Sequence, residues 1–347
     1  MSSLAPYAAP CVRACALRTA LLKPHEWEDV AGIDSAPEIV AWFKERGALP
    51  DDVSDVASAE RAAHQAVIHS SSALLRFAQG ALGDLLRCFL RYYDLINLES
   101  VIHRIHAMAE GAPAQGLPYD TGPMGMFDDI LGDVTNFAAL SRFVQGTPFA
   151  AAYEAGLQRY YEDEDASRLI ESIEVAFFAE WVKAAEHCDF SLKHGTDNSG
   201  LAVFLVERII ESAVRLKVHR EAEQSRVVEW LSLVTDEKDL DRCLEAISAD
   251  DEDEAVMALA RRLLPKQLLP KAGLPRRSVA KAGALALLRV VVLRRALKAG
   301  RGIVFSADFL TSVLVLQIYQ ALELTLLLES KETGIADIPS AYGEVAA

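Results

Sequence analysis

The chain has 347 residues, of which 51% are hydrophobic, and its 35 Lys and Arg against 50 Asp and Glu give a net charge of −15. This balance argues against a general nucleic-acid binder, because contacts to phosphate need a basic face. Five scattered cysteines exclude a small disulfide scaffold and favour a reducing compartment. Residues 2–10 lack the basic head and the apolar run of a signal peptide, so we expect none.

Apolar residues recur at steps of three and four in several parts of the chain, which is the spacing of one face of a helix. The clearest examples are residues 85–93, 169–184 and 205–216. Alternating patterns typical of strands are nearly absent, and the main β-prone run, residues 290–292, lies inside a helical pattern. We therefore predict an all-α fold.

Four clusters of glycine and proline interrupt these patterns. They lie at residues 111–125, 146–148, 193–200 and 265–275. The breaks predict three helical units, residues 1–140, 141–230 and 231–347. No proline occurs between Pro148 and Pro265, which suits long helices.

The most distinctive local motif is YYDLINL at residues 92–98, followed by VIHR at 101–104. Asp94 and Asn97 are three residues apart and share a helical face, and Arg104 supplies a base further along. Buried polar groups must be paired, so these side chains could tie the helix to a neighbouring helix and fix its register. An ordinary capped amphipathic helix is the alternative for the motif taken alone.

Two histidines of the same region offer a possible metal site. His103 and His106 share a helical face, with Glu99 and Glu110 within a turn, and such ligands could hold zinc. Histidines with flanking glutamates are also common on solvated helices, and no HExxH or paired CxxC motif supports the site. We predict no catalytic residue, cofactor or metal. A metalloenzyme that uses His103, His106 and Glu110 stays open as an alternative.

Residues 255–307 form a basic block with twelve Lys or Arg and no acidic residue, so the rest of the chain carries −27. An acidic run, residues 250–254, precedes the block. The two can neutralise each other or face solvent. Alternatively, the block forms a positive patch that faces an acidic partner or anionic lipid, and reversal of Arg294 and Arg295 to Glu would test this contact.

The apolar run at residues 309–328 is long enough to cross a bilayer, with Glu323 as its single charge. Gln317, Gln320 and Glu323 would be costly in lipid, and the chain has no second span to shelter them. We therefore predict a helix buried in a helical protein and no transmembrane span.

The 92–104 motif resembles the first D-x-x-N-L…(R/K) element of the C subunit of V-type and archaeal-type ATPases, the subunit called d in eukaryotes. Residues 12–47 are similar to the opening helical hairpin of this family. Residues 169–187 are similar to its second hairpin, in which Glu171 and Glu174 precede an aromatic pair. The order of these parts is that of the family.

The later elements of the family are matched less completely. Arg215 and Lys217 fit the R-x-K end of a second element, and Glu323 with residues 333–335 resembles the carboxy-terminal element. In the same registers, apolar residues replace the polar residues of the family; these are Val206, Ile209, Leu326 and Leu328. If those polar groups tie helices together in the family, we expect packing to replace them here.

The resemblance implies three pseudo-equivalent helical units arranged as a funnel on the cytoplasmic face of a membrane proteolipid ring. Such a funnel receives the foot of a central shaft made of D- and F-type subunits. The protein would then couple rotation to ion transport without catalysis of its own, and the basic block would face the ring, the lipid headgroups or the shaft. The alternative from another class is a helical scaffold or adaptor unrelated to rotary ATPases.

Overall fold

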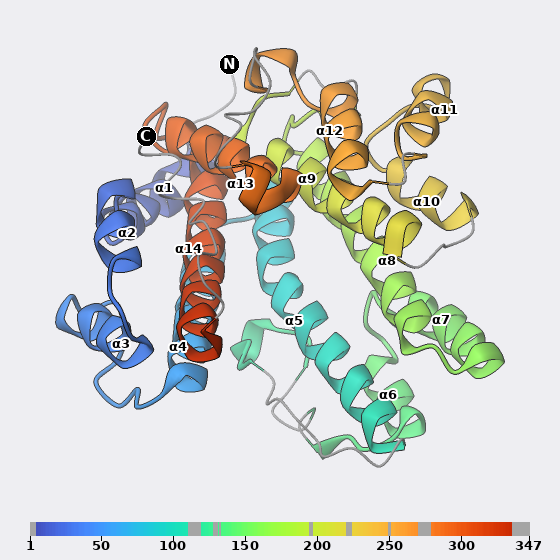
Figure 1. Ribbon diagram of the computed structural model, residues 1–347, viewed down its shortest axis with the longest axis horizontal. Helices are drawn as coiled ribbons and strands as arrows, with labels where there is room; N and C mark the ends of the chain where they lie inside the picture. The colour runs from blue at the N-terminus through green and yellow to red at the C-terminus, as the bar shows by residue number, and fades with distance from the viewer. Residues whose placement is uncertain are drawn as a thin grey trace. The chain divides into compact units, whose positions relative to one another are not determined.

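The computed structural model describes residues 5–109, 119–127, 131, 133–193, 197–219, 224–248, 251–269 and 279–334 (Figure 1). These residues form helices joined by turns and contain no strand. The predicted all-α fold is confirmed. Residues 290–292 lie inside a helix despite their β-branched side chains, because a long helical stretch with buried neighbours overrides local propensity.

The chain divides into two compact units. Unit 1 comprises residues Met1–Val67 and Ala185–Ala347, and unit 2 comprises residues Ile68–Ala184. The three-unit funnel stays a prediction.

The helices of unit 2 are α5 (Gly80–Ala109), α6 (Phe137–Val144) and α7 (Ala150–Asp163), together with most of α8 (Ala166–Glu186). An aromatic cluster joins α5 to α8: the rings of Phe89 and Trp181 lie edge to face at 5.0 Å, and Tyr92 contacts both Phe177 and Trp181. Large aromatic rings bury much apolar area in few residues, so this cluster forms the core of the unit.

Unit 1 begins with α1 (Ala5–Thr19), α2 (Pro24–Ala31), α3 (Ala36–Glu45) and the first half of α4 (Val56–Leu75). It continues with α9 (Gly200–Val214), α10 (Gln224–Leu231), α11 (Glu237–Ala246), α12 (Glu252–Leu263), α13 (Val279–Ala299) and α14 (Ala307–Thr333). Helices α9, α13 and α14 pack against one another and form the core of this unit.

Helix α9 is buried on nearly all sides and approaches its neighbours closely. A Cβ atom at Gly200 would lie 2.2 Å from Ser312 Oγ of α14 and 3.2 Å from the Cα of Ala296 in α13. Only glycine allows the start of α9 to enter between these helices. The predicted break at residues 193–200 therefore marks a close helix crossing as well as a loop.

Helix α14 contains the apolar run in which the sequence raised the question of a membrane span. Its first turn is capped by Ser306, whose Oγ accepts the N–H of Phe309 at 3.1 Å. Of the described helices, α14 is the one with the length and composition to cross a membrane, yet 61% of its most apolar stretch is buried in the structure. It packs against α1, α3, α9 and α13, as expected for a core helix.

Candidate functional site

The Asp94–Asn97–Arg104 motif lies on the buried face of α5. Asp94 is 0% exposed and Asn97 is 2% exposed. The Oγ1 of Thr121 donates to Asp94 Oδ1 at 2.8 Å, and the N–H of Met126 donates to Asp94 Oδ2 at 3.0 Å. Both carboxylate oxygens are therefore bonded to the segment that follows α5.

Asn97 and Arg104 bind the backbone of the same segment. The amide of Asn97 makes two bonds with Tyr119: Nδ2 donates to the carbonyl at 2.8 Å, and Oδ1 accepts the N–H at 2.6 Å. The Nη2 of Arg104 donates to the carbonyls of Leu131 and Val134, both at 3.0 Å. We call Asp94, Asn97 and Arg104 the loop anchor.

The loop anchor differs from the prediction in what it binds. The sequence suggested a bond between neighbouring helices, whereas the described partners lie in the 119–134 segment between α5 and α6. A glycine supports this arrangement, because a Cβ at Gly125 would overlap Thr121 Oγ1. The described parts of this segment, residues 119–127 and 131–134 without 132, are thus bonded to α5 at several points.

Burial raises the pKa of Asp94 from 3.8 to about 6, although the bonds from Thr121 and Met126 and the charge of Arg91 oppose this shift. Loss of water around a carboxylate disfavours its charged form. The loop anchor is therefore sensitive to protonation near pH 6.

A second buried polar cluster, in unit 1, was not predicted from the sequence. Glu207 of α9 is 0% exposed, and the hydroxyl of Tyr319 in α14 donates to its Oε2 at 3.0 Å. Arg289 of α13 lies 3.9 Å from Glu207 and 3.7 Å from Glu211, and Arg208 pairs with Glu211 at 2.6 Å. We call this cluster the charged junction.

The charged junction holds an unusual protonation equilibrium. Burial, and then the neighbouring charge of Glu211, raises the pKa of Glu207 from 4.5 to about 7, while Arg208, Arg289 and Tyr319 oppose the shift. Burial also tends to raise the pKa of Glu211, but the charges of the surrounding arginines outweigh this effect, so the pKa of Glu211 is lowered. Glu207 is thus the group of the pair that takes up a proton first.

The charged junction lies where apolar residues replace the family's polar pair. Val206 and Ile209 are buried, as expected from packing. Glu207, however, lies directly after Val206, and its carboxylate contacts Tyr319 of α14 and Arg289 of α13. Polar contacts therefore join the three helices here in addition to apolar packing. In α14, Leu328 is buried and Leu326 half-buried.

The other predicted interface residues are spread over both units. In unit 2, Glu171 is buried and Glu174 half-buried on α8. In unit 1, Arg215 and Lys217 lie in a π-helical turn after α9, half-buried and exposed respectively. Glu323 is half-buried on α14. Their interface role stays a prediction.

The basic block divides into inward and outward charges. Arg289 joins the charged junction, and Arg295, whose side chain is 13% exposed, lies 3.7 Å from Asp308. Arg294 and Lys298 are exposed on α13. The exposed group also includes Arg261, Arg262, Lys266 and Arg301. Lys271, Arg276, Arg277 and the side chain of Lys281 lie outside the described residues.

The acidic run before the basic block has local bonding partners. Asp251 Oδ1 accepts the N–H of Glu254 at 2.8 Å and caps α12, and Asp253 Oδ1 accepts the N–H of Ala284 at 2.6 Å. These two carboxylates satisfy backbone donors, which is a role distinct from neutralising the arginines.

The histidines give no described metal centre. His103 is exposed, while His106 Nδ1 lies 3.3 Å from the hydroxyl of Tyr160 in α7. Glu110 lies outside the described residues. Within the described ranges, no group of three or more His, Cys, Asp or Glu side chains is placed to hold a metal ion.

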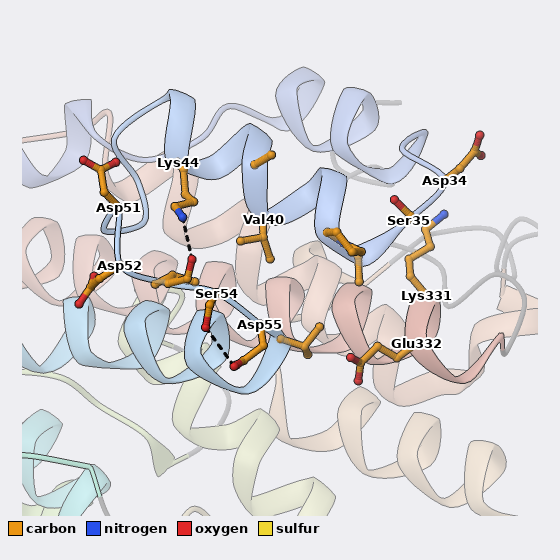
Figure 2. A pocket seen from close by; sticks show the side chains of 15 residues that line it. Asp34, Ser35, Val40, Lys44, Asp51, Asp52, Ser54, Asp55, Lys331 and Glu332 are labelled. Carbon is orange, nitrogen blue, oxygen red and sulfur yellow. Dashed lines mark hydrogen bonds between the residues drawn. The ribbon is translucent and has the colours of Figure 1, made fainter.

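A pocket of about 710 Å³ in unit 1 is lined by α3, the loop after it and the end of α14 (Figure 2). Asp51 and Asp52 lie at one end, and Asp34 and Lys331 lie at the other. The amine of Lys44 is turned toward the carbonyl of Val53, to which it donates at 2.7 Å. Carboxylates outnumber amines around this pocket, so its chemistry favours a cationic ligand; none of the predicted interface residues lines it.

Comparison with known proteins gives one family. The family model described as ATP synthase (C/AC39) subunit matches residues 10–336, nearly the whole chain. No curated protein matches the chain. The match includes α5 with the loop anchor and α9, α13 and α14 with the charged junction.

Proposed function

Because the chain belongs to the ATP synthase (C/AC39) subunit family, we propose that it is the non-catalytic central-stalk subunit of a V-type or archaeal-type rotary ATPase. In this role it lies on the cytoplasmic face of the membrane and couples the D- and F-type shaft subunits to the proteolipid ring during ion transport. The family match over residues 10–336 is the observation that carries this proposal.

The loop anchor suits such a role. A coupling subunit transmits torque through its surfaces, so a long connection that moved freely would yield under load. Asp94, Asn97 and Arg104 bond the 119–134 segment to a 30-residue helix through backbone groups. Buried, fully paired polar groups rigidify a fold.

The outward charges of the basic block offer a contact surface for acidic partner groups. Arg294 and Lys298 are exposed one helical turn apart on α13. The side chain of Arg295 is only 13% exposed, so it serves this surface less directly. Arg294→Glu/Lys298→Glu is therefore the sharper charge reversal, and it should weaken assembly in a salt-dependent manner.

Deletion of the gene tests the role in its native membrane. We expect membranes without the subunit to lose ATP-driven ion uptake while the soluble sector keeps its ATP hydrolysis, and the wild-type gene to restore uptake. Uptake that is unchanged after deletion would contradict the proposal and favour a scaffold or adaptor of another class.

A further inference from the structure

Helix α13 forms one wall of a second pocket in unit 1, of about 500 Å³. Leu287, Val290 and Val291 line it on α13, and Leu268 and Leu269 line it from the segment after α12. These five side chains form an apolar half. The volume lies within the usual range of small-molecule sites, which are mostly apolar with a few polar groups.

The other half of the pocket is cationic. Arg294, Arg295 and Lys298 continue the same stripe of α13 toward its C-terminal end. With a rise of about 1.5 Å per residue, the stripe from Leu287 to Lys298 is about 16 Å long. The pocket thus changes from apolar to positively charged along its length.

Arg295 is the most buried of these cations, and its contact with a carboxylate is long. Its Nε is buried without a hydrogen-bond partner, and its nearest described carboxylate oxygen, Asp308 Oδ2, is 3.7 Å from Nη2, too far for a hydrogen bond. Asp308 is held away by its own bonds, because its Oδ1 accepts the N–H of Gly200 at 2.9 Å and the hydroxyl of Ser312 at 3.2 Å. A mostly buried guanidinium with unused donors calls for an anion.

We propose that this pocket binds an anionic amphiphile, a molecule with one apolar chain and a carboxylate or phosphate head. The head lies beside Arg294, Arg295 and Lys298, and the chain lies against Leu287 and Val290. Asp308, the described carboxylate that faces Arg295, and Asp197, whose charge acts on Asp308, both already accept backbone N–H groups. This inference does not rest on the proposed function and is tested on the full isolated chain.

Displacement of a fluorescent fatty acid from the purified protein, below micelle-forming concentrations, measures the affinity. We expect dodecanoate to displace the probe with a dissociation constant at least ten times lower than that of dodecyltrimethylammonium, which has the same chain and the opposite charge. Inorganic phosphate alone should compete weakly, because it lacks the chain. Equal affinity for the anionic and cationic amphiphiles would overturn the proposal.

Two double variants separate this pocket from general surface charge. Arg294→Gln/Lys298→Gln should weaken the binding of dodecanoate at least five-fold. Arg261→Gln/Arg262→Gln, which removes two exposed charges from α12, should leave the affinity for dodecanoate unchanged. All four residues are exposed, so both variants should keep the wild-type circular dichroism spectrum. Equal effects of the two variants would contradict a built site.

Vesicles identify the source of the amphiphile. If a membrane phospholipid is the ligand, the protein should float with phosphatidylglycerol vesicles and not with phosphatidylcholine vesicles, and dodecanoate should release it. If a free fatty acid is the ligand, dodecanoate should bind while neither vesicle does. Binding to neither dodecanoate nor vesicles would overturn the proposal.

Discussion

The two buried polar clusters of this protein differ in the kind of partner that they bind. In unit 2, the residues of the loop anchor lie within one stretch of α5 and bind mainly backbone groups of the segment that follows. In unit 1, Glu207 binds side chains from two other helices, Tyr319 and Arg289. Backbone partners exist at every residue, so apart from Thr121 and Gly125 the loop anchor places few demands on the sequence of the segment it binds. The charged junction depends on each of its side-chain partners.

This difference predicts different costs when one member is lost. Loss of the cationic partner Arg289 leaves the carboxylates of the charged junction buried with less compensation, which costs more than an unpaired backbone group. Loss of a single neutral hydrogen bond, such as that of Tyr319, costs less than either.

Arg289→Ala should lower the free energy of unfolding by about 3 kcal/mol at pH 7.5, because Glu207 and Glu211 would then face each other with less positive charge nearby. Urea denaturation measures the change. Arg294→Ala, an exposed arginine of the same helix, is the control and should change it by about 0.5 kcal/mol or less. Equal losses in both variants would mean that the junction charges do not matter.

Asp94→Ala should cost about 2 kcal/mol, because Thr121 and the Met126 N–H lose their acceptor while the rest of the loop anchor stays. Limited proteolysis of the native protein should then cut within residues 119–134 before any other site, since the loss is local. Asp84→Ala, an exposed position of α5, is the control. If Asp94→Ala is cleaved within residues 119–134 no faster than the wild type, Asp94 does not hold the segment.

Glu207→Gln should remove the pH dependence of stability that the raised pKa of Glu207 creates. The pKa of Glu207 is raised in the folded state from 4.5 to about 7, so the folded state binds its proton more tightly. The stability that comes from this group is full below pH 4.5 and is lost as the pH rises to 7. Wild type should therefore lose stability over this window relative to Glu207→Gln, and parallel profiles would refute the shift.

Tyr319→Phe should cost about 1 kcal/mol, the value of one buried hydrogen bond. The hydroxyl of Tyr319 opposes the raised pKa of Glu207, so its removal should move the loss of stability to higher pH. Denaturation midpoints between pH 5 and 9 measure this displacement. A window that does not move would mean that the hydroxyl does not act on Glu207.

The same contrast explains what could be predicted from the sequence. The helical spacing of apolar residues is local, so the all-α fold and the helices α5, α8, α9 and α14 were accessible. The loop anchor was also accessible, because Asp94, Asn97 and Arg104 lie within about three turns of one helix. Its partners were not, because backbone carbonyls and N–H groups leave no mark in a sequence.

The charged junction was missed because its members are far apart along the chain. Tyr319 is 112 residues from Glu207, and no local pattern connects them. One signal was present: the otherwise apolar α9 carries Glu207, Arg208 and Glu211, and Arg208 alone does not compensate two carboxylates in a buried helix. An excess charge inside an apolar helix therefore predicts a distant partner without saying which residue it is.

Membership of this chain in a rotary ATPase can be measured by purification of the tagged full chain from detergent-solubilised native membranes, followed by mass spectrometry. We expect a proteolipid and the D- and F-type shaft subunits to co-purify with it in fixed ratios. A pure chain, or one accompanied only by proteins outside the ATPase, would contradict this expectation.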